Sequence, residues 1–258
     1  MPSENNNDIT KTSLVPFNTK LSYPTESSLV KPIKNDSNIK GIRDYYDSDE
    51  EDIYQYVCFA VRQLLEQLGK YEFQKKPSSK LEIQQLKTYE DGSKYFGQIN
   101  PKTKKRQGQG IYIYREDGEI YEGNWDNNLR NGTGRHLYAD GRMYTGLWKD
   151  GKEHGCGVGM WPDGRKYEGD WKKGLPNGKG TMKFANGNEY KGDFEDGKGT
   201  GEGVYTYEDG RIYEGRHKDF KADGRGVMHY PDGTKKAGEW EARDRNKKKP
   251  QLKRHKVE

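Results

Sequence analysis

Residues 166–171 read Lys-Tyr-Glu-Gly-Asp-Trp, and this stretch decides the fold because close variants of it return at a constant interval. An Asp-Gly or Asn-Gly step precedes each copy. The glycines of these steps stand at positions 118, 141, 164, 187, 210 and 233, which gives a spacing of 23 residues every time, whereas Gly92 precedes Gly118 by 26. A fixed short period indicates stacked, similar units, the first of them with a three-residue insertion.

Within a unit the side chains alternate with period two, which is typical of β-strands. The Asp-Gly or Asn-Gly step between the two halves is a strong hairpin signal. In residues 178–194 one face carries glycines and large apolar side chains: Gly178, Gly180, Met182, Phe184, Tyr190, Gly192 and Phe194. The sequence therefore predicts an all-β repeat, an elongated twisted single-layer antiparallel ribbon of hairpins, in which rings lie flat on glycine backbone.

Composition alone would suggest disorder. Only 29% of the 258 residues are hydrophobic, 34% are charged and the mean hydropathy is −1.29. However, many of the 33 glycines and 19 tyrosines recur at fixed places, and a repetitive sheet needs little core because each unit packs against its neighbours. We therefore expect disorder only in residues 1–46.

The remaining bulk properties predict a cytoplasmic protein. The net charge of +5 is modest, and Cys58 and Cys156 lack a metal-like spacing. There is no apolar run of about 18 residues, no secretory signal and no Met-Gly start for myristoylation.

An amphipathic helix is predicted over residues 47–69. Ser48 and Glu51 fit a capping box, and the helix is expected to end at Gly69. Its apolar stripe consists of Tyr54, Val57, Val61, Leu64 and Leu68. Residues 70–88 are a connector that contains either a short helix or a lead strand, and the ribbon follows over 89–241 as six full units and a partial seventh. Residues 242–258 form a basic tail.

The pattern Tyr-Glu-Gly-x-Trp, closed by Gly-x-Gly, resembles the MORN repeat (membrane occupation and recognition nexus). The resemblance covers about residues 89–240, and Lys236 departs from it because a tyrosine is expected there. It implies a binding ribbon with a groove and no catalytic role. It also implies junctions between membranes, cytoskeletal assemblies or ciliary radial spokes as settings, so a small protein of the radial-spoke-head type is the specific expectation.

Two sets of side chains are candidate binding surfaces. The repeated rings are expected to form a partner-binding groove, which comprises Tyr121, Trp125, Tyr144, Trp148, Trp161, Tyr167, Trp171, Tyr190, Phe194 and Tyr213. The same rings could instead hold neighbouring units together. The opposite face is apolar in the early units and charged from Lys166 onward. The apolar patch comprises Ile111, Ile113, Leu137, Met143, Leu147, Val158 and Met160. We expect the helix to dock on this patch, and the alternative is that a foreign helix or a second copy of the ribbon covers it.

Basic residues cluster in the first-unit insertion and in the tail, where they could attract acidic phospholipid or an acidic protein: Lys102, Lys104, Lys105, Arg106, Lys247, Lys248 and Lys249. A solvated tail without a specific partner is an equally simple reading.

No enzyme, cofactor or metal site is expected. Residues 192–200 nearly spell a phosphate loop, but Gly199 stands where serine or threonine is required, and no helix follows. The five histidines lie apart from acids and cysteines, and the repeated carboxylates lack a desolvated pocket.

The sequence favours a non-enzymatic scaffold that binds protein partners through the aromatic groove, in a cytoskeletal or ciliary (axonemal) assembly and with homodimerisation open. The alternative is a peripheral membrane adapter that binds acidic phospholipid. No nucleic acid partner is expected.

Overall fold

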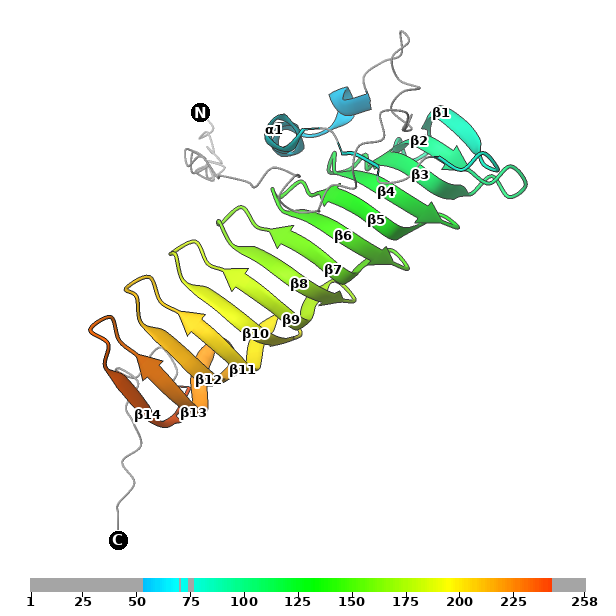
Figure 1. The fold of residues 1–258 in the computed structure, drawn as a ribbon. Coiled ribbons are helices and arrows are strands. Elements are labelled where there is room, and N and C mark those ends of the chain that lie inside the picture. The colour runs from blue at the N-terminus through cyan, green and yellow to red at the C-terminus, as the bar shows by residue number, and fades with distance from the viewer. Residues whose placement is uncertain (1–52, 70, 74–76, 243–258) are drawn as a thin grey trace, which may run out of the picture.

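A computed structural model describes residues 53–69, 71–73 and 77–242. In them a 3-10 turn, η3 (Ile53–Tyr56), and one helix, α1 (Phe59–Leu68), precede a single antiparallel sheet of 14 strands in sequence order, drawn in Figure 1 as an elongated twisted ribbon. The strands are β1 (Glu82–Thr88), β2 (Lys94–Ile99), β3 (Arg106–Ile113), β4 (Ile120–Asp126), β5 (Leu129–Leu137), β6 (Met143–Lys149), β7 (Lys152–Met160), β8 (Lys166–Lys172), β9 (Leu175–Lys183), β10 (Glu189–Glu195), β11 (Lys198–Thr206), β12 (Ile212–Lys218), β13 (Lys221–His229) and β14 (Lys235–Trp240). The predicted fold class is confirmed.

The ribbon has two different long edges because two kinds of turn alternate. The long-turn edge consists of the Asp-Gly type turns at residues 89–93, 114–119, 138–142, 161–165, 184–188, 207–211 and 230–234. The short-turn edge consists of two-residue turns with positive φ at both positions, such as Asp150 (50°) and Gly151 (80°). The exception is the first connection, the six-residue loop 100–105 between β2 and β3. Two positive φ values in succession match the twist of antiparallel strands.

The inner face holds neighbouring repeats together through rings that lie on glycine backbone. Tyr167 is fully buried, and its hydroxyl donates to the Asp170 carbonyl at 2.8 Å. A methyl group added at Gly180 on the next strand would lie 2.5 Å from Cζ of this ring. The indole of Trp171 donates to the Gly157 carbonyl at 3.1 Å. Since close variants of this arrangement recur from repeat to repeat, ring–glycine contacts are what stack the units.

The outer face is covered by α1 at its N-terminal end only. Val57, Val61, Leu64 and Leu68 are buried in one cluster with side chains from β2 to β7: Phe96, Ile111, Ile113, Ile120, Leu137, Met143, Val158 and Met160. Figure 1 shows α1 lying against this end of the sheet. The backbone N–H of Cys58 donates to the Gly118 carbonyl at 3.1 Å, which ties the start of α1 to the long-turn edge.

A buried ion pair fixes the other end of α1. Arg135 donates to Glu122 from Nε at 2.9 Å and from Nη2 at 2.5 Å, and both side chains are almost fully buried. Nη2 of Arg135 also donates to the Gly69 carbonyl at 2.9 Å, just after the last turn of the helix. The sheet therefore binds the helix terminus by a charge-assisted hydrogen bond as well as by apolar packing.

Several sequence-based boundaries need correction. The helix begins at Phe59 rather than near residue 47, because the chain is extended at Cys58, whose φ and ψ are −68° and 166°. Its predicted end at Gly69 agrees with the structure. The connector contains a strand, β1. The proposed capping box, the N-terminal disorder and the last 16 residues lie outside the described residues.

Leu147 does not belong to the docking patch. It is 42% exposed, whereas Met143 on the same strand is buried under the helix. Leu147 pairs with Thr133 toward the short-turn edge, four residues beyond Met143, and α1 covers the strand near the long-turn edge only.

Replacing Val61 and Leu64 by aspartate is expected to release α1 from the sheet. Each fully buried apolar side chain contributes about 1.5–3 kcal/mol, and a carboxylate in its place is strongly disfavoured. Limited proteolysis should then cut before residue 77, and the melting temperature should fall. The matched control is Gln63→Asp with Gln67→Asp on the exposed side of the same helix. Equal protease resistance of the two double variants would contradict docking.

Candidate functional site

The rings assigned from sequence to a partner-binding groove are mostly inaccessible. Nine of the ten are at most 6% exposed, since each packs on the glycines and rings of a neighbouring strand: Tyr121, Trp125, Tyr144, Trp148, Tyr167, Trp171, Tyr190, Phe194 and Tyr213. Their assignment to a contact surface is therefore corrected. Burial also raises the pKa of Tyr190 and of Tyr213 to about 12, so these hydroxyls stay protonated. Only Trp161 is half-buried.

Trp161 belongs to a different row of rings, which the sequence reasoning missed. Each turn of the long-turn edge begins with an aromatic residue that packs on the inner-face cluster with part of its ring exposed. This aromatic row comprises Tyr89, Tyr114, Tyr138, Trp161, Phe184, Tyr207 and Tyr230. The signal was present, since an aromatic residue stands three or four positions before every turn glycine. Successive members are two strands apart, a spacing of about 10 Å.

Arginines of the turns lie against three members of the row, and the guanidinium carbon of Arg106, on β3, lies 5.8 Å from the ring centre of Tyr89. The guanidinium carbons of Arg142 and Arg165 lie 4.5 and 5.3 Å from the ring centres of Tyr138 and Trp161, and that of Arg211 lies 4.5 Å from Tyr207. We call Arg142, Arg165 and Arg211 the turn arginines. Each follows an Asp-Gly step, and the aspartate two residues earlier accepts from both the arginine backbone N–H and its Nε. Each guanidinium is thus held by a ring and a carboxylate.

In the turn of Arg211 the hydrogen bonds also favour the charged form of the aspartate. The backbone N–H of Arg211 donates to Asp209 at 3.1 Å and holds the pKa of that carboxyl below its ordinary value. The clamp therefore persists across the neutral pH range.

One polar cluster interrupts the aromatic inner face. His136 is stacked on Tyr138 with ring centres 4.0 Å apart, and its Nε2 lies 3.1 Å from Glu119. Arg130 approaches the other ring nitrogen at 2.7 Å, and burial lowers the pKa of His136. The hydroxyl of Tyr138 donates to Glu153. His136 therefore lies between Arg130 and Glu119, and the cluster connects neighbouring repeats.

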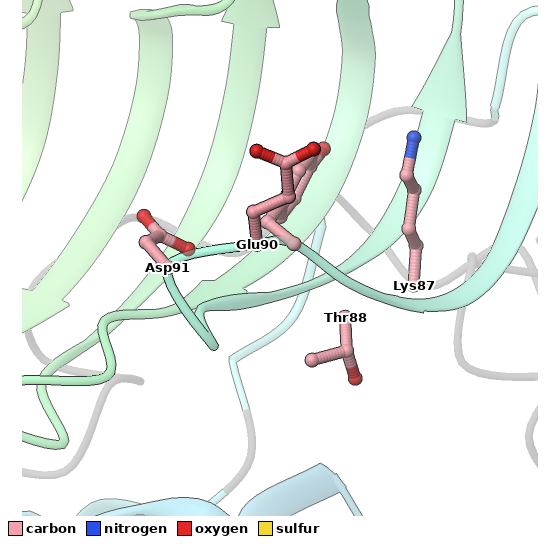
Figure 2. A pocket seen from close by; sticks show the side chains of 5 residues that line it. Lys87, Thr88, Glu90 and Asp91 are labelled. Atoms are coloured by element: carbon pink, nitrogen blue, oxygen red, sulfur yellow. The ribbon is translucent and has the colours of Figure 1, made fainter.

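A shallow hollow of about 510 Å³ lies at the N-terminal end of the aromatic row, beside Tyr89. Its other lining residues are Lys87, Thr88, Glu90 and Asp91. Figure 2 shows Lys87 and Glu90 extending to the same side of the strand and Thr88 to the opposite side. The hollow does not enclose a small molecule. It adds a surface with both basic and acidic side chains beside Tyr89, the first ring of the aromatic row.

The basic loop is less available than the sequence suggests. Lys104 forms an ion pair with Glu82 at 2.7 Å. The guanidinium carbon of Arg106 lies 4.4 Å from the ring centres of both Tyr112 and Trp125. Lys102 and Lys105 are exposed. The tail lysines at 247–249 lie outside the described residues. In the described part of the chain, no helix is both long and apolar enough to cross a membrane.

Fourteen consecutive hairpin strands joined by one ring–glycine arrangement define a β-hairpin repeat protein, a class that binds partners along an extended surface. The sequence model of the MORN repeat matches six segments: 104–118, 121–141, 144–164, 167–189, 190–210 and 221–235. The chain belongs to the MORN-repeat family. MORN-repeat proteins are typically non-enzymatic repeat scaffolds, and MORN repeats indicate a protein-binding or membrane-associated adapter.

Comparison with individual proteins adds little. No curated protein sequence matches the chain. Among solved structures, the chain is similar to the TCP domain of SAS-4 (dCPAP) from Drosophila melanogaster, determined in complex with a proline-rich motif of Ana2 (dSTIL). The TM-score is 0.36 and the identity is 19%, over 65% of this chain and 97% of that one.

Proposed function

We propose that this protein is a non-enzymatic scaffold that binds an extended segment of a protein partner along its long-turn edge. The observation that carries this proposal is the aromatic row, in which seven half-buried rings recur once for every two strands of the sheet. Aromatic rings that remain partly exposed supply contact area with little loss of side-chain entropy, and aromatic residues are enriched at binding surfaces for this reason. An extended segment can follow such a row over several repeats.

The cellular setting in this proposal comes from family analogy. A cytoplasmic, cytoskeleton-associated assembly is proposed, with the ciliary axoneme as its specific case. The edges of β1 and β14 are the ends of the sheet in the described residues, so pairing of two copies through a terminal strand is compatible with the same role.

Lipid binding by the basic loop is a weaker proposal. Two of the four basic side chains of the loop already contact groups of the protein, namely Glu82 and the inner-face rings. A surface charge that is paired within the protein attracts an anionic membrane less strongly.

Replacing Trp161 and Tyr207 by alanine is expected to reduce partner capture from native cell extract. The captured amount of any protein that docks on the aromatic row should be at least about fivefold lower than with the unmodified chain, because two anchor rings are lost. Quantitative mass spectrometry of the captured proteins measures this amount. Capture should persist at about 0.5 M salt, because attraction between exposed charges is largely screened at that concentration.

The matched control is Leu129→Ala with Leu175→Ala, which removes two side chains that are 48% and 46% exposed on the short-turn edge. A partner set that responds equally to both double variants, or to neither, would overturn the proposed edge. Capture that disappears at high salt for every variant would favour the lipid or charge-based reading instead.

A further inference from the structure

The turn arginines are oriented as receptors for carboxylates. Nε of Arg142, Arg165 and Arg211 is occupied by an aspartate at 2.6, 2.7 and 2.8 Å, and one side of each guanidinium faces a ring. The side chains remain 45%, 42% and 39% exposed. No acceptor within the described ranges takes a hydrogen bond from their Nη groups. Two parallel N–H groups on a fixed planar cation match the geometry of a carboxylate.

The spacing of two of these arginines selects an extended acidic peptide. Arg142 and Arg165 occupy equivalent positions of neighbouring repeats, about 10 Å apart along the edge. In an extended polyproline-type chain three residues span about 9 Å and return to the same side. Carboxylates at positions i and i+3 would therefore meet consecutive arginines, while the side chains between them lie along the aromatic row.

This chain carries a segment of that description. Residues 44–52 contain six acids, with three-residue spacings at Asp44/Asp47, Asp47/Glu50 and Asp49/Asp52. The segment precedes η3, whose Tyr56 packs on the outer-face cluster, with its ring centre 3.9 Å from Nζ of Lys94 at the start of β2, beside the first turn. From there the segment has to pass over the long-turn edge to reach the turn arginines. Asp47 and Asp44 precede Ile53, where η3 begins, by 6 and 9 residues. An extended chain of these lengths spans up to about 20 and 30 Å, and the 3-10 turn to Tyr56 adds about 6 Å. The turns of Arg142 and Arg165 lie two and three repeats away, about 19 and 29 Å.

We propose that residues 44–52 occupy the long-turn edge, with two carboxylates on Arg142 and Arg165, and thereby compete with a protein partner for the same rings. This inference rests on the proposed function, since it names a regulator of the proposed binding edge. The contact is largely electrostatic, whereas the partner contact is largely aromatic. Salt should therefore weaken the internal contact first and open the edge.

The test uses the full chain and a fluorescent peptide of residues 42–54. The neutralised chain carries Asp44→Asn, Asp47→Asn, Asp49→Asn, Glu50→Gln, Glu51→Gln and Asp52→Asn. The peptide should bind the neutralised chain at least about tenfold more tightly than it binds the unmodified chain, whose own segment competes with it. Fluorescence anisotropy at 50 mM and 500 mM salt measures both affinities, and the higher salt should weaken binding.

Arg142→Gln with Arg165→Gln, introduced into the neutralised chain, should reduce peptide binding at least about tenfold. The control, Lys172→Gln with Lys173→Gln, removes the same charge from exposed positions on the short-turn edge and should leave binding unchanged. The proposal is overturned if the peptide does not bind, if the arginine and lysine variants bind it equally, or if the neutralised and unmodified chains bind it equally. Partner capture that still depends on Trp161 and Tyr207 would then show that only the inference has failed.

Discussion

Replacing Gly180 by alanine is expected to destabilise the ribbon by about 2–4 kcal/mol, although it adds a single methyl group. That methyl would meet Cε2 and Cζ of Tyr167, both at 2.5 Å. The ring cannot retreat, because it is fully buried between Trp171 and Phe194, whose ring centres lie 5.3 and 4.7 Å away. Displacing it would also break the hydrogen bond from its hydroxyl to the Asp170 carbonyl. Urea and thermal unfolding measure the loss.

The position of the damage distinguishes this explanation from a general loss of stability. In a repeat protein each unit contacts only its neighbours, so hydrogen exchange should accelerate most in β8, β9 and β10. The control is Gly187→Asn in an exposed turn, where φ is 82° and asparagine is the best-tolerated substitute. Equal effects of the two substitutions would contradict the ring–glycine account.

Removing the guanidinium of Arg135 is expected to cost about 3–5 kcal/mol, because Glu122 would remain as a buried charge without its main partner. The Gly69 carbonyl would lose its donor in the same step, so the end of α1 should fray. Arg135→Ala should therefore lower the melting temperature and also increase cleavage of the N-terminal segment in limited proteolysis.

Two companion variants make this expectation specific. Arg135→Met with Glu122→Met removes both charges and should recover most of the stability, since buried pairs are often replaceable by apolar side chains of similar volume. Arg165→Ala breaks an exposed pair and should cost no more than about 1 kcal/mol. If Arg135→Ala is no worse than Arg165→Ala, the pair does not hold the helix.

The repeat period was enough to predict the strands, their antiparallel order and the division of side chains between the two faces. Alternate residues of a strand point to opposite faces, so the period of two assigns each side chain to a face, and the period of 23 gives the succession of the strands. The helix patch was identified for the same reason. Ile111 and Val158 stand at outward positions where later repeats carry charge, and the structure places both under α1.

The binding surface was harder to predict because alternation assigns a ring to a face but does not reveal what lies on top of it. Tyr167 and Trp161 both belong to the inner face. Tyr167 is covered by the glycines and rings of adjacent strands, whereas Trp161 lies at the end of its strand and stays half-buried. Arg135 and Glu122 each resembled an ordinary solvated residue, since only the strand register makes them partners.

The position of α1 gives the ribbon a polarity. The repeats alone form a nearly periodic rod, in which a partner could dock in several registers shifted by one unit. Because the helix covers the outer face only from β2 to β7, the two ends of the rod differ in thickness, in outer-face chemistry and in the residues that flank the long-turn edge. The two ends of the ribbon are therefore distinguishable to a bound segment, which gives the segment a preferred direction and register.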